Sequence, residues 1–194
     1  MVEMKSLSFD EQLAALRARG FGEGDPAFTA ALESARPAEP AERSLLAWSR
    51  GVLPIADAAA QIEREGKPVV LGHLEPEELA SFEPIEAVEL PDAPAYLALD
   101  VDLGEAFRNV RPEDALKEIL AAGRSPLTVD EGIALMLQQP SVIARNWGFS
   151  MAGSRRGDQR VPAMWISERR PKLGWCWDRN PHTWLGTASC AGRV

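Results

Sequence analysis

The hydrophobic pattern at the start of the chain predicts an amphipathic helix with a defined beginning and end. Ser8 and Glu11 have the spacing of a capping box, in which each side chain bonds to the backbone amide near the other residue. Leu13 and Leu16 follow at helical spacing, and Gly20 is of the residue type that commonly ends a helix.

Similar patterns predict three more helices before the first strand. Asp25 stands where a helix N-cap is expected, and Pro26 follows at the first helical position, where its missing amide hydrogen is tolerated. Two further apolar stretches, residues 43–50 and 56–64, are interpreted as short helices. Residues 1–66 are therefore expected to form a helical N-terminal subregion.

The middle of the chain alternates between strand-like and helix-like patterns. Short apolar or alternating runs bounded by glycine or proline are typical of strands, and apolar residues spaced three and four apart are typical of helices. Strands are predicted from PVVLGH, IEAVEL and PAYLALDVDLG, and helices from EPEELASF, RPEDALKEILAAG and TVDEGIALMLQQP. Residues 67–140 are therefore expected to be a mixed α/β segment.

After Pro140 the sequence changes to short strand-like runs rich in tryptophan and glycine. NWGFSMAG and RVPAMWIS flank a polar turn, KLGWCWD follows, and TWLGTASCAG has the pattern of a fourth strand. Residues 141–194 are therefore expected to form a C-terminal antiparallel β segment. The predicted fold is a single α+β domain, 1–194, with N-terminal helices packed on a mixed sheet and a C-terminal antiparallel, Trp-rich β-meander.

Composition and cysteine usage favour a soluble protein of the cytoplasm. Hydrophobic residues make up 45% of the chain and charged residues 26%, which is ordinary for a globular domain. The first residues contain no apolar signal region, and no run is long enough to span a bilayer. Cytoplasmic residence without a membrane partner is therefore expected, with Cys176 and Cys190 as free thiols.

Charge is unevenly distributed along the chain. The net charge is −8, yet residues 1–140 carry 12 Lys and Arg against 26 Asp and Glu, while residues 141–194 carry 9 against 3. An acidic total disfavours nucleic-acid binding, whereas the basic C-terminal segment is suited to attract an anion locally. The same asymmetry is also explained if the two parts attract each other on folding.

Three segments carry a family resemblance: YLALDVDLGEAFRNVRPEDALKEIL, GRSPLTVDEGIALMLQQP and GSRRGDQRVPAMWISERRPKLGWCWDRNPHTWLGTASCAGR. They resemble an uncharacterised actinobacterial family that is catalogued as a domain of unknown function. The resemblance covers residues 95–193 well and the N-terminal helices loosely, and its most specific strings are GSRRGDQRVPAMWIS and LGWCWDRNPHTWLG. It implies a single cytoplasmic unit and no particular activity, cofactor or catalytic residue.

Metal binding and covalent catalysis are both disfavoured by spacing. Cys176, His182 and Cys190, with His73 as a fourth member, are able to ligate zinc, but their separations match no standard zinc motif. A thiol–imidazole pair oriented by Asp178 is the catalytic alternative, yet neither cysteine begins a recognisable helix. The sequence therefore predicts no metal and no cofactor, and buried cysteines in the core.

Two acidic pairs have simpler structural explanations. Asp100 and Asp102 lie at strand spacing, which is typical of an edge strand that enters a polar turn and also of a magnesium site. Asp130 and Glu131 lie at the start of a predicted helix, where negative charge complements the helix dipole. Neither pair is taken as a site.

The C-terminal segment contains the candidate binding residues. An aromatic-walled recess with a few polar groups is how small-molecule sites are commonly built, and the planar arginine fork suits carboxylate or phosphate. The predicted anion ligands are Arg155, Arg160 and Arg179, the predicted walls are Trp177 and Trp184, and the predicted orienting groups are His182 and Asn180. The simpler alternative is that most of these indoles are core and that Asp178 and Asn180 cap a turn.

Three functions remain open at this stage. The leading hypothesis is a binding protein for a small anionic or aromatic molecule. The second is an enzyme in which His182 is a general acid/base and Asp178 or Asp158 its partner, because an imidazole transfers protons readily at neutral pH. The third is a structural homo-oligomer subunit with a Trp-rich face.

Overall fold

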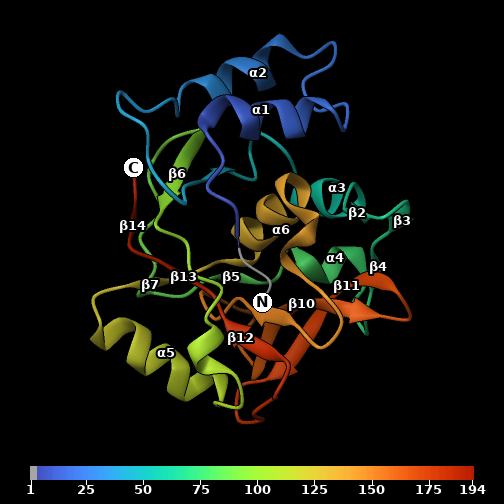
Figure 1. The fold of residues 1–194 in the computed structure, drawn as a ribbon, viewed down its shortest axis with the longest axis vertical. Coiled ribbons are helices and arrows are strands. Elements are labelled where there is room, and N and C mark those ends of the chain that lie inside the picture. The colour runs from blue at the N-terminus through green and yellow to red at the C-terminus, as the bar shows by residue number, and fades with distance from the viewer. Residues whose placement is uncertain (1–3) are drawn as a thin grey trace.

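The computed structural model describes residues 4–194, which form helices and several small sheets, and the predicted α+β class is confirmed (Figure 1). Residues 1–3, with which the predicted domain 1–194 and subregion 1–66 begin, lie outside the described residues. The helices are α1 Phe9–Arg17, α2 Pro26–Glu33, α3 Ile55–Ala60, α4 Pro76–Leu79, α5 Pro112–Ala121 and α6 Val129–Gln138, with 3-10 turns η1 Glu105–Phe107 and η2 Pro140–Val142.

The strands are short except for one central hairpin. They are β1 Leu45–Trp48, β2 Glu63–Arg64, β3 Lys67–Pro68, β4 Val70–Leu71, β5 Glu83–Pro84, β6 Ala95–Leu99, β7 Ser125–Pro126, β8 Gly148–Ser150, β9 Ser154–Arg155, β10 Arg160–Ser167, β11 Arg170–Trp177, β12 Leu185–Thr187, β13 Ser189–Cys190 and β14 Gly192–Arg193. A five-stranded sheet has the order β12-β8-β10-β11-β4, and a three-stranded sheet has the order β1-β6-β14.

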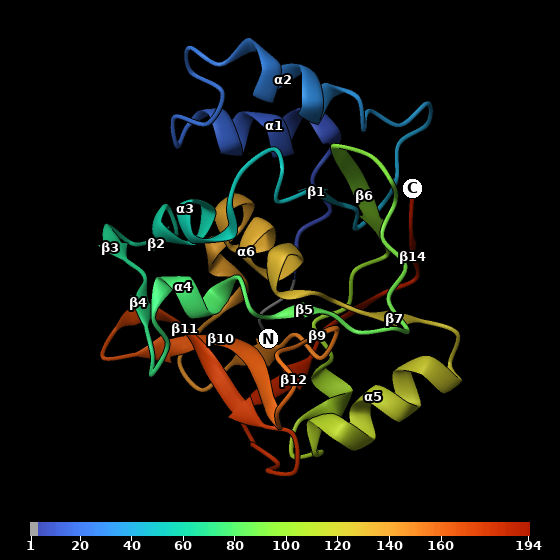
Figure 2. The same cartoon turned by 180° about the vertical axis from the view of Figure 1, so that it is seen from behind.

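These elements stack in layers along the longest axis of the molecule. Helices α1 and α2 cover the three-stranded sheet at one end, while the five-stranded sheet and α5 lie at the other end (Figures 1 and 2). Helix α6 lies between the two sheets and is buried along its whole length except at its second residue, Asp130. A helix that is buried on every side organises the core of the molecule rather than its surface.

The predicted helix starts at the N-terminus are confirmed. Ser8 and Glu11 form both bonds of a capping box at α1, and the Asp25 carboxylate accepts from the amide of Phe28 while Pro26 occupies the first position of α2. These local signals predict structure well because a cap depends only on residues within one helical turn.

The predicted helix over residues 43–50 is wrong, because its core, Leu45–Trp48, is strand β1. All four residues of β1 are buried, and they pair in antiparallel register with β6. The strand has α6 on one side and the N-terminal helices on the other, so it has no polar face. A short apolar run of this kind cannot be distinguished from a buried helix by its period.

Two other boundaries also differ from the sequence prediction. Helix α3 ends at Ala60, so the helix predicted over residues 56–64 is too long, and its last two residues belong to β2. The strand predicted from residues 85–90 is absent there: the segment turns, and the amide of Val88 bonds to the carbonyl of Ile85. Alternation alone does not create a strand where no neighbouring strand pairs with it.

The C-terminal segment is a β-hairpin with additions rather than a pure antiparallel meander. Strands β8, β10 and β11 pair antiparallel as predicted, but β12 pairs parallel with β8, and β4 pairs parallel with β11. The run predicted as a fourth strand is divided among β12, β13 and β14, which belong to three different sheets. The end of the chain therefore ties the two main sheets together.

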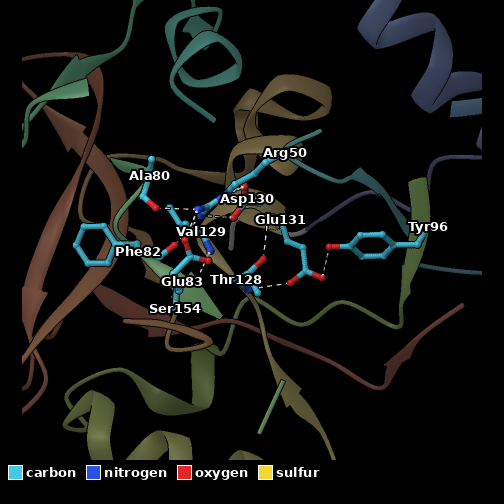
Figure 3. Close-up of polar contacts among 10 residues, drawn as sticks. All are labelled: Arg50, Ala80, Phe82, Glu83, Tyr96, Thr128, Val129, Asp130, Glu131 and Ser154. Carbon is cyan, nitrogen blue, oxygen red and sulfur yellow. Dashed lines mark hydrogen bonds and ion pairs between the residues drawn. The ribbon is translucent and has the colours of Figure 1, made fainter. Parts of the chain in front are cut away.

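Polar groups at the start of α6 fix this buried helix in place (Figure 3). The guanidinium of Arg50 grips the Asp130 carboxylate with two bonds of 2.8 and 2.9 Å, and it also donates to the carbonyls of Ala80 and Phe82. Thr128 and Glu131 form a capping box that is wholly buried. Asp130 and Glu131, whose positions the sequence analysis explained by the helix dipole, are thus also partners in ion pairs.

Glu131 forms a buried ion pair with Arg193, next to the last residue of the chain. Its two oxygens accept from Nε and Nη2 of Arg193 at 2.6 and 2.9 Å, and the side chains are 0% and 3% exposed. The Tyr96 hydroxyl donates to the same carboxylate at 3.3 Å, and burial raises the pKa of Tyr96. Although burial opposes the charge of Arg193, its bonds to Glu131 raise its pKa above the ordinary value.

We expect Arg193→Met to lower the free energy of unfolding by about 3–5 kcal/mol, because it leaves the Glu131 carboxylate buried without its cation. Urea unfolding measures the loss. The matched control is Arg36→Met, which removes solvent-exposed ion pairs with Asp10 and Glu33 and is expected to have a much smaller effect. Equal effects of the two substitutions would contradict the importance given to the buried pair.

Candidate functional site

The face of the five-stranded sheet that points away from α6 carries a second, smaller core. Along β10, Val161, Ala163 and Trp165 point to this face, and the intervening Met164 points to the main core. Cys176 on β11 lies opposite Val161 and shares the face. Leu116 of α5 and the half-buried Trp165 and Trp184 cover part of it.

Two glycines make room for Trp165 on this face. A Cβ atom at Gly174 would lie 2.7 Å from the Trp165 ring, and one at Gly148 would lie 2.9 Å from the Trp165 Cβ, so neither position accepts a side chain without a shift. Because no side chain projects from these two glycines, the rings of Trp165 and Trp184 approach to 5.8 Å between centroids, at an angle of 58° between their planes. This is a favourable distance for an aromatic pair.

Where these rings meet the end of the sheet, the surface is hollowed. The cavity has a volume of about 260 Å³. It is lined by Ala144, Asn146, Trp147, Trp165, Ile166 and Trp184, and we call it the indole hollow. Its three indoles come from three separate segments: the turn before β8, the middle of β10 and the residue before β12.

A tight turn forms one rim of the indole hollow. Ala144 and Trp147 exchange two backbone hydrogen bonds of 3.0 Å, so Arg145 and Asn146 occupy the turn between them. Asn146 has a φ of 60°, a conformation that asparagine tolerates better than most residues. The indole nitrogen of Trp147 donates to the carbonyl of Val142 at 3.1 Å, which fixes the orientation of that ring.

Three cations near the hollow lack a carboxylate partner. Arg108 lies over the Trp147 ring with its guanidinium carbon 5.5 Å from the centroid, and the Lys172 ammonium is 5.9 Å from the Trp165 centroid. Arg145 is exposed at the turn. Within residues 4–194 none of the three has an acidic oxygen within 4.0 Å. Positive side chains without a carboxylate partner therefore lie near the hollow, although the whole chain is acidic.

His182 lies beside this hollow, with its ring 5.2 Å from that of Trp184. Its backbone carbonyl accepts from the amides of Asn109 and Leu185, which anchors the loop before β12. Burial lowers the pKa of His182 below its ordinary value, because the charged imidazolium loses hydration there. Among the described residues, no side chain forms a hydrogen bond with the imidazole, so the geometry pairs it with an aromatic ring rather than with Asp178.

The other predicted wall, Trp177, lies on the opposite face of the sheet. Trp177 packs edge-on against Trp175 with centroids 4.7 Å apart, and the guanidinium carbon of Arg160 is 4.8 Å from the Trp175 centroid. Arg160 is within 4.0 Å of carboxylate oxygens of Asp158 and Glu78. This second aromatic pair therefore has a cation whose charge is already compensated.

Arg155 and Asp178 are both turned toward the interior near Cys176. Arg155 donates to the carbonyls of Ala152 and Ser154, and burial lowers its pKa although the Asp178 charge opposes that shift. No side-chain nitrogen of Arg155 lies within 4.0 Å of a carboxylate oxygen of Asp178, so the two residues form no ion pair. Oδ1 of Asp178 is shielded from solvent and has no hydrogen-bond partner among the described residues. Neither residue lines the indole hollow.

The remaining predicted ligands lie in the exposed loop after β11. Arg179 lies 3.5 Å from a carboxylate oxygen of Glu113, and the amide of Asn180 bonds to the carbonyl of Trp177 within the turn. The structure therefore brings Trp184 and His182 together with Trp147 and Trp165. It does not bring Arg155, Arg160 and Arg179 to the same place.

Sequence reasoning did not name Trp147 and Trp165 as walls, nor Arg108, Arg145, Lys172 and Asn146 as candidates. Arg108 lies 75 positions before Thr183, whose carbonyl it contacts, and several helices and strands separate the two residues in the sequence. Nothing in a single sequence signals such a contact. The pattern of strand pairing did carry one clue, because Lys172 stands opposite Trp165 across the β10–β11 hairpin.

The two thiols and the metal-ligand candidates do not form a reactive centre. Burial raises the pKa of Cys176 to about 12 and that of Cys190 to about 11, so both thiols are protonated at neutral pH. Residues 4–194 contain no group of three or more His, Cys, Asp or Glu side chains placed to hold a metal ion. In the same part of the chain, no helix has the length and apolar character needed to cross a bilayer.

These features define an α+β protein with an aromatic hollow at the end of its larger sheet. The chain belongs to a family of unknown function, DUF5701, whose match extends over residues 11–194 and thus includes both sheets and the hollow. No curated protein and no solved structure matches the chain.

We expect His182 to titrate below about 6.5, the ordinary imidazole value, because burial favours its neutral form. The unfolded chain then binds more protons than the folded chain as the pH falls through 6.5, so the contribution of His182 to stability is present above that value and is lost below it. NMR titration of the imidazole measures the midpoint.

The matched experiment is His182→Gln, which should flatten the dependence of the unfolding free energy on pH between about 7.5 and 5.5. A midpoint at or above 6.5 would show instead that a carboxylate stabilises the imidazolium, as the acid/base alternative requires.

Proposed function

We propose that this protein binds a small, planar, negatively charged molecule in the indole hollow. The observation that carries the proposal is the meeting of three indoles, Trp147, Trp165 and Trp184, around one open cavity. Aromatic walls hold flat ligands by stacking and by removal of apolar surface from water.

The charge of the surroundings supports an anion rather than a neutral or cationic ligand. Arg108, Arg145 and Lys172 each lie next to a residue that lines the hollow and have no carboxylate partner among the described residues, while most other arginines of the chain have one. A cation that is not neutralised by the protein is available to a ligand. The basic balance of residues 141–194 points the same way.

The proposal places this binding activity in the cytoplasm. Both cysteines are free and buried, which is compatible with a reducing compartment. The role of such a protein is to capture or sense its ligand, since the hollow contains no hydrogen-bonded acid/base pair to drive a reaction.

Replacement of one wall tests the proposal. We expect Trp184→Leu to weaken the binding of aromatic anions by about fivefold to thirtyfold, because the ligand loses about 1–2 kcal/mol of ring contact while leucine still covers the second core. Calorimetric titration with benzoate, 2-naphthoate and 1-naphthyl phosphate measures the affinities. If none of these anions binds the wild-type protein at millimolar concentration, the proposal fails.

The matched control is Trp177→Leu, at an indole that is 43% exposed on the opposite face of the sheet. Its affinity for the same anions should equal that of the wild type. The variant also addresses the homo-oligomer alternative, because an exposed indole pair is the feature that favours it. Sedimentation of both proteins decides whether Trp177 holds copies of the chain together.

A further inference from the structure

Arg108 is held in a fixed position beside the indole hollow. Its Nε donates to the carbonyl of Thr183 at 2.8 Å, which places it next to Trp184, and its guanidinium carbon lies 5.5 Å from the Trp147 centroid. A hydrogen bond and an aromatic contact thus restrain a side chain that is otherwise exposed. A side chain that is already restrained loses less conformational entropy when a ligand binds to its guanidinium, so the free-energy cost of binding is smaller.

The outer end of this guanidinium is free. The bond to Thr183 uses Nε, and neither Nη1 nor Nη2 has a hydrogen-bond partner among residues 4–194. A planar pair of N–H donors with this geometry matches the two oxygens of a carboxylate. Arg111, three residues further along, differs because Asp114 and Glu113 already occupy its guanidinium.

The volume of the hollow suits a small ring system. At the packing density of an organic liquid, about 0.55, the hollow accommodates about 140 Å³ of ligand atoms, starting from its volume of about 260 Å³. That is the size of a fused two-ring acid. A nucleotide is considerably larger and would extend into solvent.

On the basis of the proposed function, we infer that Arg108 is the specificity-determining residue of the indole hollow and that the ligand class is a fused two-ring aromatic carboxylate. The ring system lies against Trp165 and Trp184, and the carboxylate accepts two hydrogen bonds from Nη1 and Nη2 of Arg108. Asn146, which also lines the hollow, supplies an amide that is suited to a polar ring substituent.

The test compares 2-naphthoate with its neutral isostere 2-naphthamide by calorimetric titration. Wild-type protein should bind the acid about tenfold to a hundredfold more tightly than the amide, as expected for a charge-assisted pair. Arg108→Lys, which keeps the charge but loses the fork, should remove most of that preference and leave the affinity for the amide unchanged. The matched control, Arg111→Lys, should retain the wild-type preference.

The outcomes separate this inference from the proposed function. Equal binding of acid and amide, or an unchanged preference in Arg108→Lys, overturns the role of Arg108 while the hollow remains a binding site. Binding of 1-naphthyl phosphate without 2-naphthoate overturns the carboxylate class alone. Absence of all binding overturns both. Indole N–H resonances of Trp165 and Trp184 that shift with 2-naphthoate would place the ligand against the two rings proposed to hold it.

Discussion

The rest of the structure depends on the buried ion pair between Glu131 and Arg193. A carboxylate and a guanidinium that lose their hydration are tolerated only together, so the end of the chain and the start of α6 must occupy fixed relative positions. The remaining donors of Arg193 are satisfied as well, by the Ser125 hydroxyl and the Pro126 carbonyl. The pair therefore restrains three segments, β14, β7 and α6, with one side chain.

This constraint reaches the indole hollow through a short length of chain. Between Trp184 and Arg193 lie β12, β13 and β14, each of two or three residues and each in a different sheet. Such short strands form few ladder bonds, so their position depends on contacts at their ends. Arg124 adds one of these contacts, because its Nε donates to the Ser189 hydroxyl while its terminal nitrogens bond to Asp100. The position of Trp184 thus depends on the same bonds of Arg193 and Arg124 that hold the end of the chain against the core.

The division of aromatic residues between two faces explains why only part of the C-terminal segment forms a hollow. Alternation along β11 sends Trp175 and Trp177 to one face and Cys176 to the other. Arg160 and its acidic partners accompany the first pair, whereas Trp165 and Trp184 meet over glycines on the second. Arg108, Arg145 and Lys172, which have no carboxylate partner among the described residues, lie near the second group.

The sequence by itself determined the α+β class, the capped starts of α1, α2 and α6, the antiparallel β10–β11 hairpin and the concentration of aromatic and basic residues after position 140. These features depend on neighbours within a few residues, and a single chain displays them directly. It also named Trp184 and His182 as candidates, and the structure places their rings side by side. Only the tertiary structure decided that residues 45–48 are a strand, because pairing with β6 and contact with α6 override local pattern. The tertiary structure likewise decided that Arg108 lies beside the indole hollow. The number of charges along the chain does not predict this, because the bond from Arg108 to Thr183 joins residues that are far apart in the sequence.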